Sequence, residues 1–87
     1  MEQILITNLE QVTDCCPVQW YAKTLENQPV YIRFRHGQLS VNIGPVNGTI
    51  DDALSTRRWY DELVASDHED DIDFNEVCRL TGLSIKS

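Results

Sequence analysis

The chain has 87 residues and a net charge of −7, and nearly all of that charge falls in its last third. Residues 1–60 hold six acids and five bases, whereas residues 61–87 hold eight acids and two bases, a net charge of −6. This length predicts a single domain over residues 1–87, and the negative field argues against binding to nucleic acid or to an anionic membrane. We expect attraction to a basic protein surface instead.

The N-terminal segment and the cysteines predict a cytoplasmic protein. Residues 1–12 start with an acid and lack the cationic and apolar regions of a signal peptide, and no run approaches the roughly 20 apolar residues of a membrane span. The cysteines, Cys15, Cys16 and Cys78, are odd in number and lack CxxC spacing, which favours free thiols in a reducing compartment. Along this segment we expect a short edge strand at residues 3–6 and one helical turn capped by Asn8.

The central stretch, residues 29–43, predicts a β-hairpin. Two runs that alternate apolar and polar residues are separated by His36 and Gly37 alone, the length of a two-residue hairpin loop. This spacing predicts a register that places apolar pairs on one face: Phe34 with Leu39, Ile32 with Val41, and Val30 with Ile43. A preceding strand at residues 18–25 completes a three-stranded meander, with Trp20 on the apolar face opposite Phe34.

Two helices follow the meander in our prediction. Thr49 and Asp52 form a capping box at the start of a helix that extends to about residue 66, and the apolar residues of this helix share one face, which we expect to cover the sheet. Asp73 caps a second helix that ends at Gly82. The predicted fold is therefore α+β: a three- or four-stranded antiparallel meander with one long helix on its apolar face and a short C-terminal helix.

The sequence offers no pattern for catalysis, a metal or a cofactor. The acidic run of residues 67–73 fails as a calcium loop, because Ile72 stands where the loop needs glycine and Cys78 where it needs glutamate. The cysteines and histidines lack the close spacing of zinc ligands, and no nucleophile motif or glycine-rich phosphate loop accompanies them. We therefore expect a protein that is not an enzyme and uses no cofactor.

The C-terminal helix carries a second pattern. Residues 74–84, FNEVCRLTGLS, resemble the first helix and turn of a helix-turn-helix. The net charge of −6 around this segment argues against DNA recognition through it. A capped helix that ends at glycine explains the same residues.

Two groups of residues are candidates for binding a partner. The first, which we call the acidic surface, consists of carboxylates in the C-terminal third: Asp67, Glu69, Asp70, Asp71 and Asp73. The second, the basic-aromatic face, combines arginine and aromatic residues, which are enriched at interaction hot spots: Tyr31, Arg33 and Arg35 on the outer sheet face, with Arg58 and Trp59 farther along the chain. A solvated surface that meets only water is the alternative reading of either group.

The meander also resembles a group of proteins. The sequences PVQW at residues 17–20, VYIRFRHGQLSV at residues 30–41 and GTIDDA at residues 48–53 look like those of short uncharacterised proteins encoded by bacteriophages and bacterial mobile elements. The resemblance implies a stoichiometric inhibitor of a host enzyme, such as an anti-CRISPR or anti-restriction protein. We expect it to bind through the acidic surface. The alternatives are a structural or regulatory subunit, including a homodimer, that binds through Tyr31, Arg33 and Arg35, and a nucleic-acid-binding protein that uses the same face.

Overall fold

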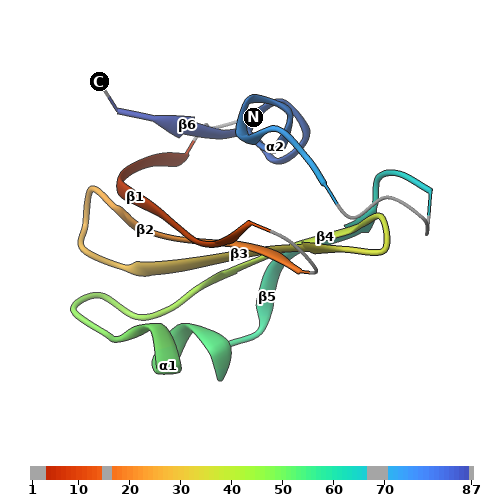
Figure 1. The fold of residues 1–87 in the computed structure, drawn as a ribbon. Coiled ribbons are helices and arrows are strands. Elements are labelled where there is room, and N and C mark those ends of the chain that lie inside the picture. Colours follow the sequence, from red (N-terminus) through yellow and green to blue (C-terminus); the bar gives the residue numbers. More distant parts are fainter. Residues whose placement is uncertain (1–3, 15–16, 67–70, 87) are drawn as a thin grey trace.

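A computed structural model of the chain describes residues 4–14, 17–66 and 71–86. The described residues form one six-stranded sheet with the order β5-β4-β3-β2-β1-β6, and two short helices (Figure 1). In chain order the elements are β1 (Ile4–Asp14), β2 (Val18–Thr24), β3 (Pro29–Arg35), β4 (Gln38–Ile43), α1 (Ile50–Leu54), β5 (Arg58–Leu63), α2 (Phe74–Thr81) and β6 (Leu83–Ile85).

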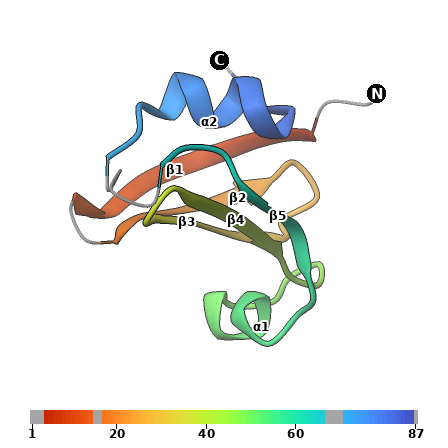
Figure 2. The same ribbon diagram turned by 90° about the vertical axis from the view of Figure 1, so that its right-hand side faces the viewer.

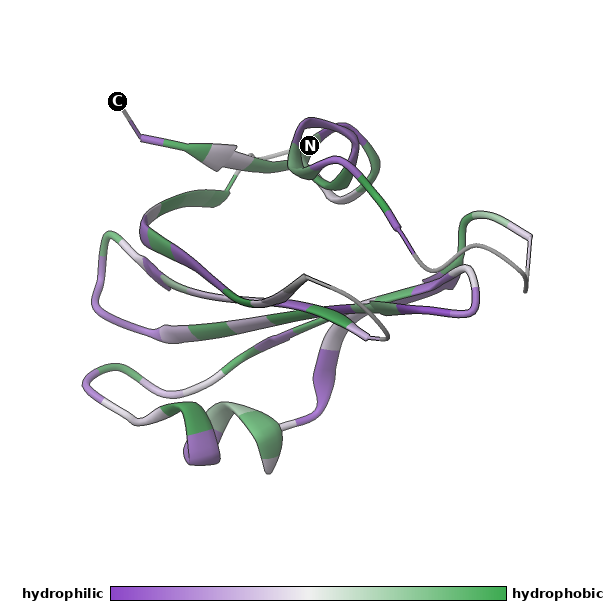
Figure 3. Ribbon diagram, in the orientation of Figure 1, coloured by the Kyte–Doolittle hydropathy of each residue, from purple (hydrophilic) through white to green (hydrophobic). Residues whose placement is uncertain are grey.

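The sheet curls into a half-barrel, and its inner face carries the core. Apolar and polar stretches alternate along β2, β3 and β4 (Figure 3), so each strand turns one set of side chains inward. Figures 1 and 2 show α2 on one side of the sheet and α1 on the other. The core cluster combines inner sheet residues with one residue of α2: Ile6, Val18, Trp20, Ala22, Val30, Ile32, Phe34, Leu39, Val41, Val77 and Leu83.

The predicted hairpin is confirmed in full. Strands β3 and β4 pair Val30 with Ile43, Ile32 with Val41 and Phe34 with Leu39. The loop residues His36 and Gly37 both have positive φ, 51° and 76°, as a type I′ turn requires. Local sequence therefore fixes this part of the sheet.

The strand before the hairpin has the predicted facing but a different register. Trp20 is buried on the inner face as expected, yet it pairs with Ile32 and not with Phe34. The amide of Thr24 donates to the carbonyl of Gln28 at 3.0 Å, so the turn closes two residues earlier than predicted. A shift of two residues keeps every side chain on its face, and for this reason the apolar pattern does not distinguish the two registers.

The prediction for the N-terminal segment is wrong. Instead of a short strand and a helical turn, β1 continues for 11 residues and pairs with both β2 and β6. Asn8 does not cap a helix; it has a φ of 55° and lies at the first of two register shifts in the β1–β2 ladder. Such irregularities break the alternation by which a strand is recognised in sequence.

The prediction of a long helix after Thr49 is also wrong, and so is the predicted fold class. Helix α1 has the expected capping box at Thr49 but ends after five residues. The segment that follows forms β5, which pairs with the free edge of β4. Strands hold 51% of the structure and helices 17%, in a mixed sheet with two short helices. Helix α1 does not cover the apolar face; it packs on the outer face, where the side-chain amide of Asn42 donates to the carbonyls of Ala53 (3.1 Å) and Thr56 (3.0 Å).

The second helix forms as predicted, and it is the one that covers the core. Asp73 caps α2 by accepting a hydrogen bond from the amide of Asn75, and Gly82 ends it with a φ of 84°. Strand β6 then runs parallel to β1, so a strand follows where a helix-turn-helix would continue with a helix. Of the helices in the described residues, neither combines the length and apolar character needed to span a membrane.

Candidate functional site

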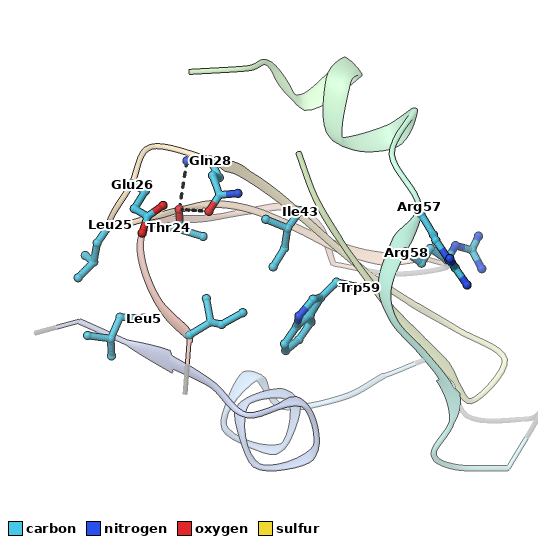
Figure 4. Close-up of a pocket in the computed structure, with 10 residues that line it drawn as sticks. Leu5, Thr24, Leu25, Glu26, Gln28, Ile43, Arg57, Arg58 and Trp59 are labelled. Atoms are coloured by element: carbon cyan, nitrogen blue, oxygen red, sulfur yellow. Dashed lines mark hydrogen bonds between the residues drawn. The ribbon is translucent and has the colours of Figure 1, made fainter. Parts of the chain in front are cut away.

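A cleft of about 590 Å³ lies at one end of the half-barrel (Figure 4). Four separate segments line it: the start of β1, the turn between β2 and β3, the end of β4 and the start of β5. Its lining residues are Ile4, Leu5, Thr24, Leu25, Glu26, Gln28, Ile43, Arg57, Arg58 and Trp59. We call it the Trp59 cleft.

Apolar side chains dominate the Trp59 cleft and remain partly open to solvent. Leu5 is 39% exposed, Leu25 53% and Trp59 41%. In Figure 4 the indole of Trp59 projects into the space that Leu5, Leu25 and Ile43 surround. Large apolar side chains gathered around a concavity are typical of a site that is covered by a ligand or a partner.

An irregularity in β5 places the indole there. Tyr60 pairs with Val41 and Arg58 with Asn42, so Trp59 is an extra residue opposite no partner of its own. Successive side chains on a regular strand point to opposite faces, whereas the rings of Trp59 and Tyr60 lie 6.4 Å apart, which requires one face. The bulge therefore turns Trp59 inward and leaves Arg58 on the outer face beside Asn42.

The polar wall of the cleft is held by its own hydrogen bonds. The hydroxyl of Thr24 donates to Oε1 of Gln28 (3.2 Å) and accepts from the amide of Gln28 (3.1 Å). The Nε2 of Gln28 donates to the carbonyl of Gly44 at 3.2 Å. Because these groups already have partners, the wall is fixed in shape, and an occupant gains most from the apolar side.

The two arginines at the cleft differ in their surroundings. Nη1 of Arg58 lies 3.0 Å from Oδ2 of Asp61, whereas Arg57 forms no ion pair with another described residue. Figure 4 shows both side chains directed away from Trp59. Hydrogen bonds from Gln38 and from Arg58 lower the pKa of Asp61, so the Arg58–Asp61 pair stays charged at neutral pH.

The predicted basic-aromatic face is split by the structure. Tyr31 is only 9% exposed, because it packs against Tyr21 (ring centroids 6.0 Å apart) and hydrogen-bonds Gln19. Arg33 is half-buried and Arg35 is exposed. Arg58 shares this outer face, but Trp59 lies on the inner one. Tyr31 therefore presents little surface of its own, whereas Arg33, Arg35 and Arg58 lie at the surface.

The predicted acidic surface is described only in part. Asp67, Glu69 and Asp70 lie outside the described residues, as do Cys15 and Cys16. Asp71 and Asp73 are exposed just before α2, where Asp73 serves as the cap. Cys78 is half-buried on α2, and this burial raises the pKa of its thiol. Within the described ranges, no three side chains among His, Cys, Asp and Glu gather closely enough to hold a metal ion.

Part of the cleft could be predicted from the sequence. Arg58 and Trp59 stand out there as candidates for a binding surface, whereas the wall residues Leu5, Leu25 and Ile43 do not. A signal existed at Leu25, an apolar residue that falls outside the alternation of its strand. Comparison with protein-family models, curated proteins and solved structures found no match to the chain.

Proposed function

We propose that this chain is a non-enzymatic protein-binding module that acts as a stoichiometric inhibitor of a host protein. The observation that carries the proposal is the Trp59 cleft, where a partly exposed tryptophan and two exposed leucines surround a concavity. Tryptophan and arginine are the residues that most often dominate binding energy at protein interfaces. The cleft has the size to accept one or two apolar side chains of a target.

The charge distribution supports a basic target. Residues 61–87 carry a net charge of −6, and within the described part of this segment Glu62, Asp71 and Asp73 form no ion pair with another described residue. An acidic field of this kind speeds the encounter with a basic surface and weakens as salt is added. In this proposal the acidic surface attracts the target and the Trp59 cleft anchors it.

The inhibitor class rests on the resemblance to phage and mobile-element proteins. The resemblance implies a target in host defence, which makes an anti-CRISPR or anti-restriction activity the specific form of the proposal. Nucleases of host defence present basic surfaces for nucleic acid. An acidic protein that covers such a surface blocks substrate access without any chemistry of its own.

The test is capture of host proteins on the immobilised chain, followed by mass spectrometry and titration of the protein retained. Trp59→Ala is expected to weaken binding by at least about tenfold, as for a hot-spot residue. Leu54→Ala is the matched control, since Leu54 is 50% exposed on α1 but does not line the cleft. Equal binding by both variants contradicts a role for the cleft.

Charge is tested separately on the same captured protein. Joint neutralisation of Asp67, Glu69, Asp70 and Asp71 is expected to reduce affinity, and so is a rise in salt from low to physiological strength. Binding that is insensitive to both contradicts the acidic mechanism and leaves the anchoring role of Trp59 in place.

A second candidate is a structural or regulatory subunit that binds through the outer sheet face. One observation favours it: Arg33 and Arg35 form no ion pair with another described residue. Arg33→Ala with Arg35→Ala is then expected to abolish association without a change in the circular dichroism spectrum. A gel-shift titration in low salt tests the remaining candidate, nucleic-acid binding through these arginines, and retardation at micromolar protein would support it.

A further inference from the structure

The charges along strand β5 are complementary to those of a second β5 that runs in the opposite direction. Residues 57–62 read Arg-Arg-Trp-Tyr-Asp-Glu, with both bases first and both acids last. When two copies of this segment run antiparallel, the bases of one face the acids of the other. Opposite charges directly across a strand pair stabilise it, and like charges destabilise it.

The facing of the side chains has the same symmetry. Arg58 and Asp61 lie on the outer face, where their side chains meet at 3.0 Å. Trp59 and Tyr60 both lie on the inner face because of the bulge. From Arg58 to Asp61 the side chains thus lie on the outer, inner, inner and outer face in turn. This order is the same when the segment is read backwards, so in an antiparallel pair of β5 strands each residue meets one on the same face. In a regular strand this reversal would place inward residues opposite outward ones.

Strand β5 is also the end of the sheet in the observed order, and it is the longer of the two edge strands. Its side chains are exposed except at Tyr60, and Leu63 is 65% exposed. An edge strand of this kind offers unpaired backbone groups to another strand. The charges of β5 complement those of a second β5 and repel strands that would place like charges opposite them. The edge therefore favours a copy of itself over other strands.

We propose that two copies of this chain associate by antiparallel pairing of their β5 strands. Arg58 of each copy faces Asp61 of the other, Arg57 faces Glu62, and Trp59 faces Tyr60. The net charge of −7 on each copy opposes this approach, but charges separated by more than about 8 Å are largely screened at physiological ionic strength. The four opposed pairs lie in direct contact and escape most of that screening.

The dimer does not rest on the proposed function. The two share Trp59, so self-association and capture of a target compete for the start of β5. The two tests remain separate: a natural chain that stays monomeric overturns the dimer without bearing on target capture, and a chain that captures no target leaves the dimer proposal in place.

The test is sedimentation velocity of the full chain at physiological salt, from micromolar to millimolar concentration. The natural sequence is expected to shift from one chain to two as concentration rises. The acidic variant (Arg57→Glu with Arg58→Glu) and the basic variant (Asp61→Lys with Glu62→Lys) are each expected to stay monomeric. An equimolar mixture of the two variants is expected to form a heterodimer, because every opposed pair is then of opposite charge.

The matched control reverses another exposed ion pair, that between Glu76 and Arg79 on α2. Glu76→Arg with Arg79→Glu is expected to leave the dimer unchanged. A natural chain that remains monomeric throughout overturns the proposal, and so does a dimer that survives both charge-reversed variants. Hydrogen exchange on the natural chain provides a test without variants. Protection of the β5 amides is expected to rise with protein concentration while protection of β6 stays constant, and β5 protection that stays constant in a dimer also overturns the proposal.

Discussion

Trp20 and Phe74 meet edge to face, with ring centroids 5.2 Å apart and planes inclined by 64°. Trp20 lies on β2 and Phe74 is the first residue of α2, so this contact joins the inner face of the sheet to the helix that covers it. Aromatic pairs in this arrangement contribute beyond the area they bury. The closure of the core thus depends on a helix of eight residues held at its first turn.

Phe74→Ala is expected to destabilise the protein by about 3 kcal/mol, the lower end of the range for deletion of a buried aromatic ring, because Phe74 is only partly buried. Phe74→Leu keeps most of the apolar volume and loses the ring contact, so a smaller cost of about 1 kcal/mol is expected. Urea unfolding followed by fluorescence measures both. Equal costs for the two variants would show that the ring contact with Trp20, and not the apolar volume, determines stability at this position.

Asn42 ties α1 to the outer face of the sheet, and its replacement is expected to loosen that helix. Its side chain is buried and donates to the carbonyls of Ala53 and Thr56. Asn42→Ala removes both donors and is expected to cost about 2 kcal/mol. Asn42→Asp has the same shape but only acceptors at neutral pH, so we expect it to cost at least as much. Thermal unfolding at neutral pH measures both costs. An aspartate variant as stable as the natural protein would contradict a stabilising role for the two hydrogen bonds that Asn42 donates.

Two glycines with positive φ separate backbone strain from steric overlap. Gly37 (φ 76°) lies in the β3–β4 turn, where an added methyl would overlap the carbonyl oxygens of Ala65 and Ser66. Gly82 (φ 84°) ends α2 with nothing within 4 Å of the same methyl. Gly82→Ala is expected to cost about 1 kcal/mol from backbone conformation alone. Gly37→Ala is expected to cost clearly more in the same unfolding assay. A smaller cost at Gly37 would mean that the segment after β5 moves away from the added methyl with little loss of stability.

Local patterns allowed prediction of the hairpin and of both helix starts, since a two-residue loop and a capping box act over a few residues. The segment after α1 was misassigned because Tyr60, Leu63 and Val64 also suit a helical face. The choice of strand depends on the free edge of β4, far away in sequence. The bulges of β1 and the extra residue at Trp59 likewise interrupt the alternation of apolar and polar residues. These two strands are therefore hard to recognise in the sequence, although pairing with their neighbours stabilises them in the sheet.

The candidate site was only partly predictable for a related reason. Trp59 stands out in the sequence as a large residue beside two arginines. Its cleft is made by β1, β4 and the β2–β3 turn, which meet only when the sheet curls. Tyr31 was expected at the surface because alternation places it on the polar face, but a neighbouring ring, that of Tyr21, covers it there. Alternation predicts the face of a residue and not its exposure.

Asp61 is expected to titrate below the ordinary range of an aspartate in the folded protein. Hydrogen bonds from Gln38 and then from Arg58 lower its pKa by favouring the charged form. A carboxyl whose pKa is lower in the folded state stabilises the fold above the pKa of the unfolded chain. That contribution is lost as the pH falls through the folded-state pKa. Because Asp61 is exposed, we expect the effect in its own titration curve and not in a large change of stability.

Carbon-detected NMR of the side-chain carboxyl measures this titration directly. Gln38→Ala and Arg58→Gln are each expected to raise the pKa of Asp61, and the double variant is expected to return it to the ordinary range. Glu76, whose pKa is lowered by Arg79 on α2, is the internal control and is expected to titrate unchanged in all three variants. If Asp61 already titrates in the ordinary range in the natural chain, the Gln38 and Arg58 contacts do not persist in solution.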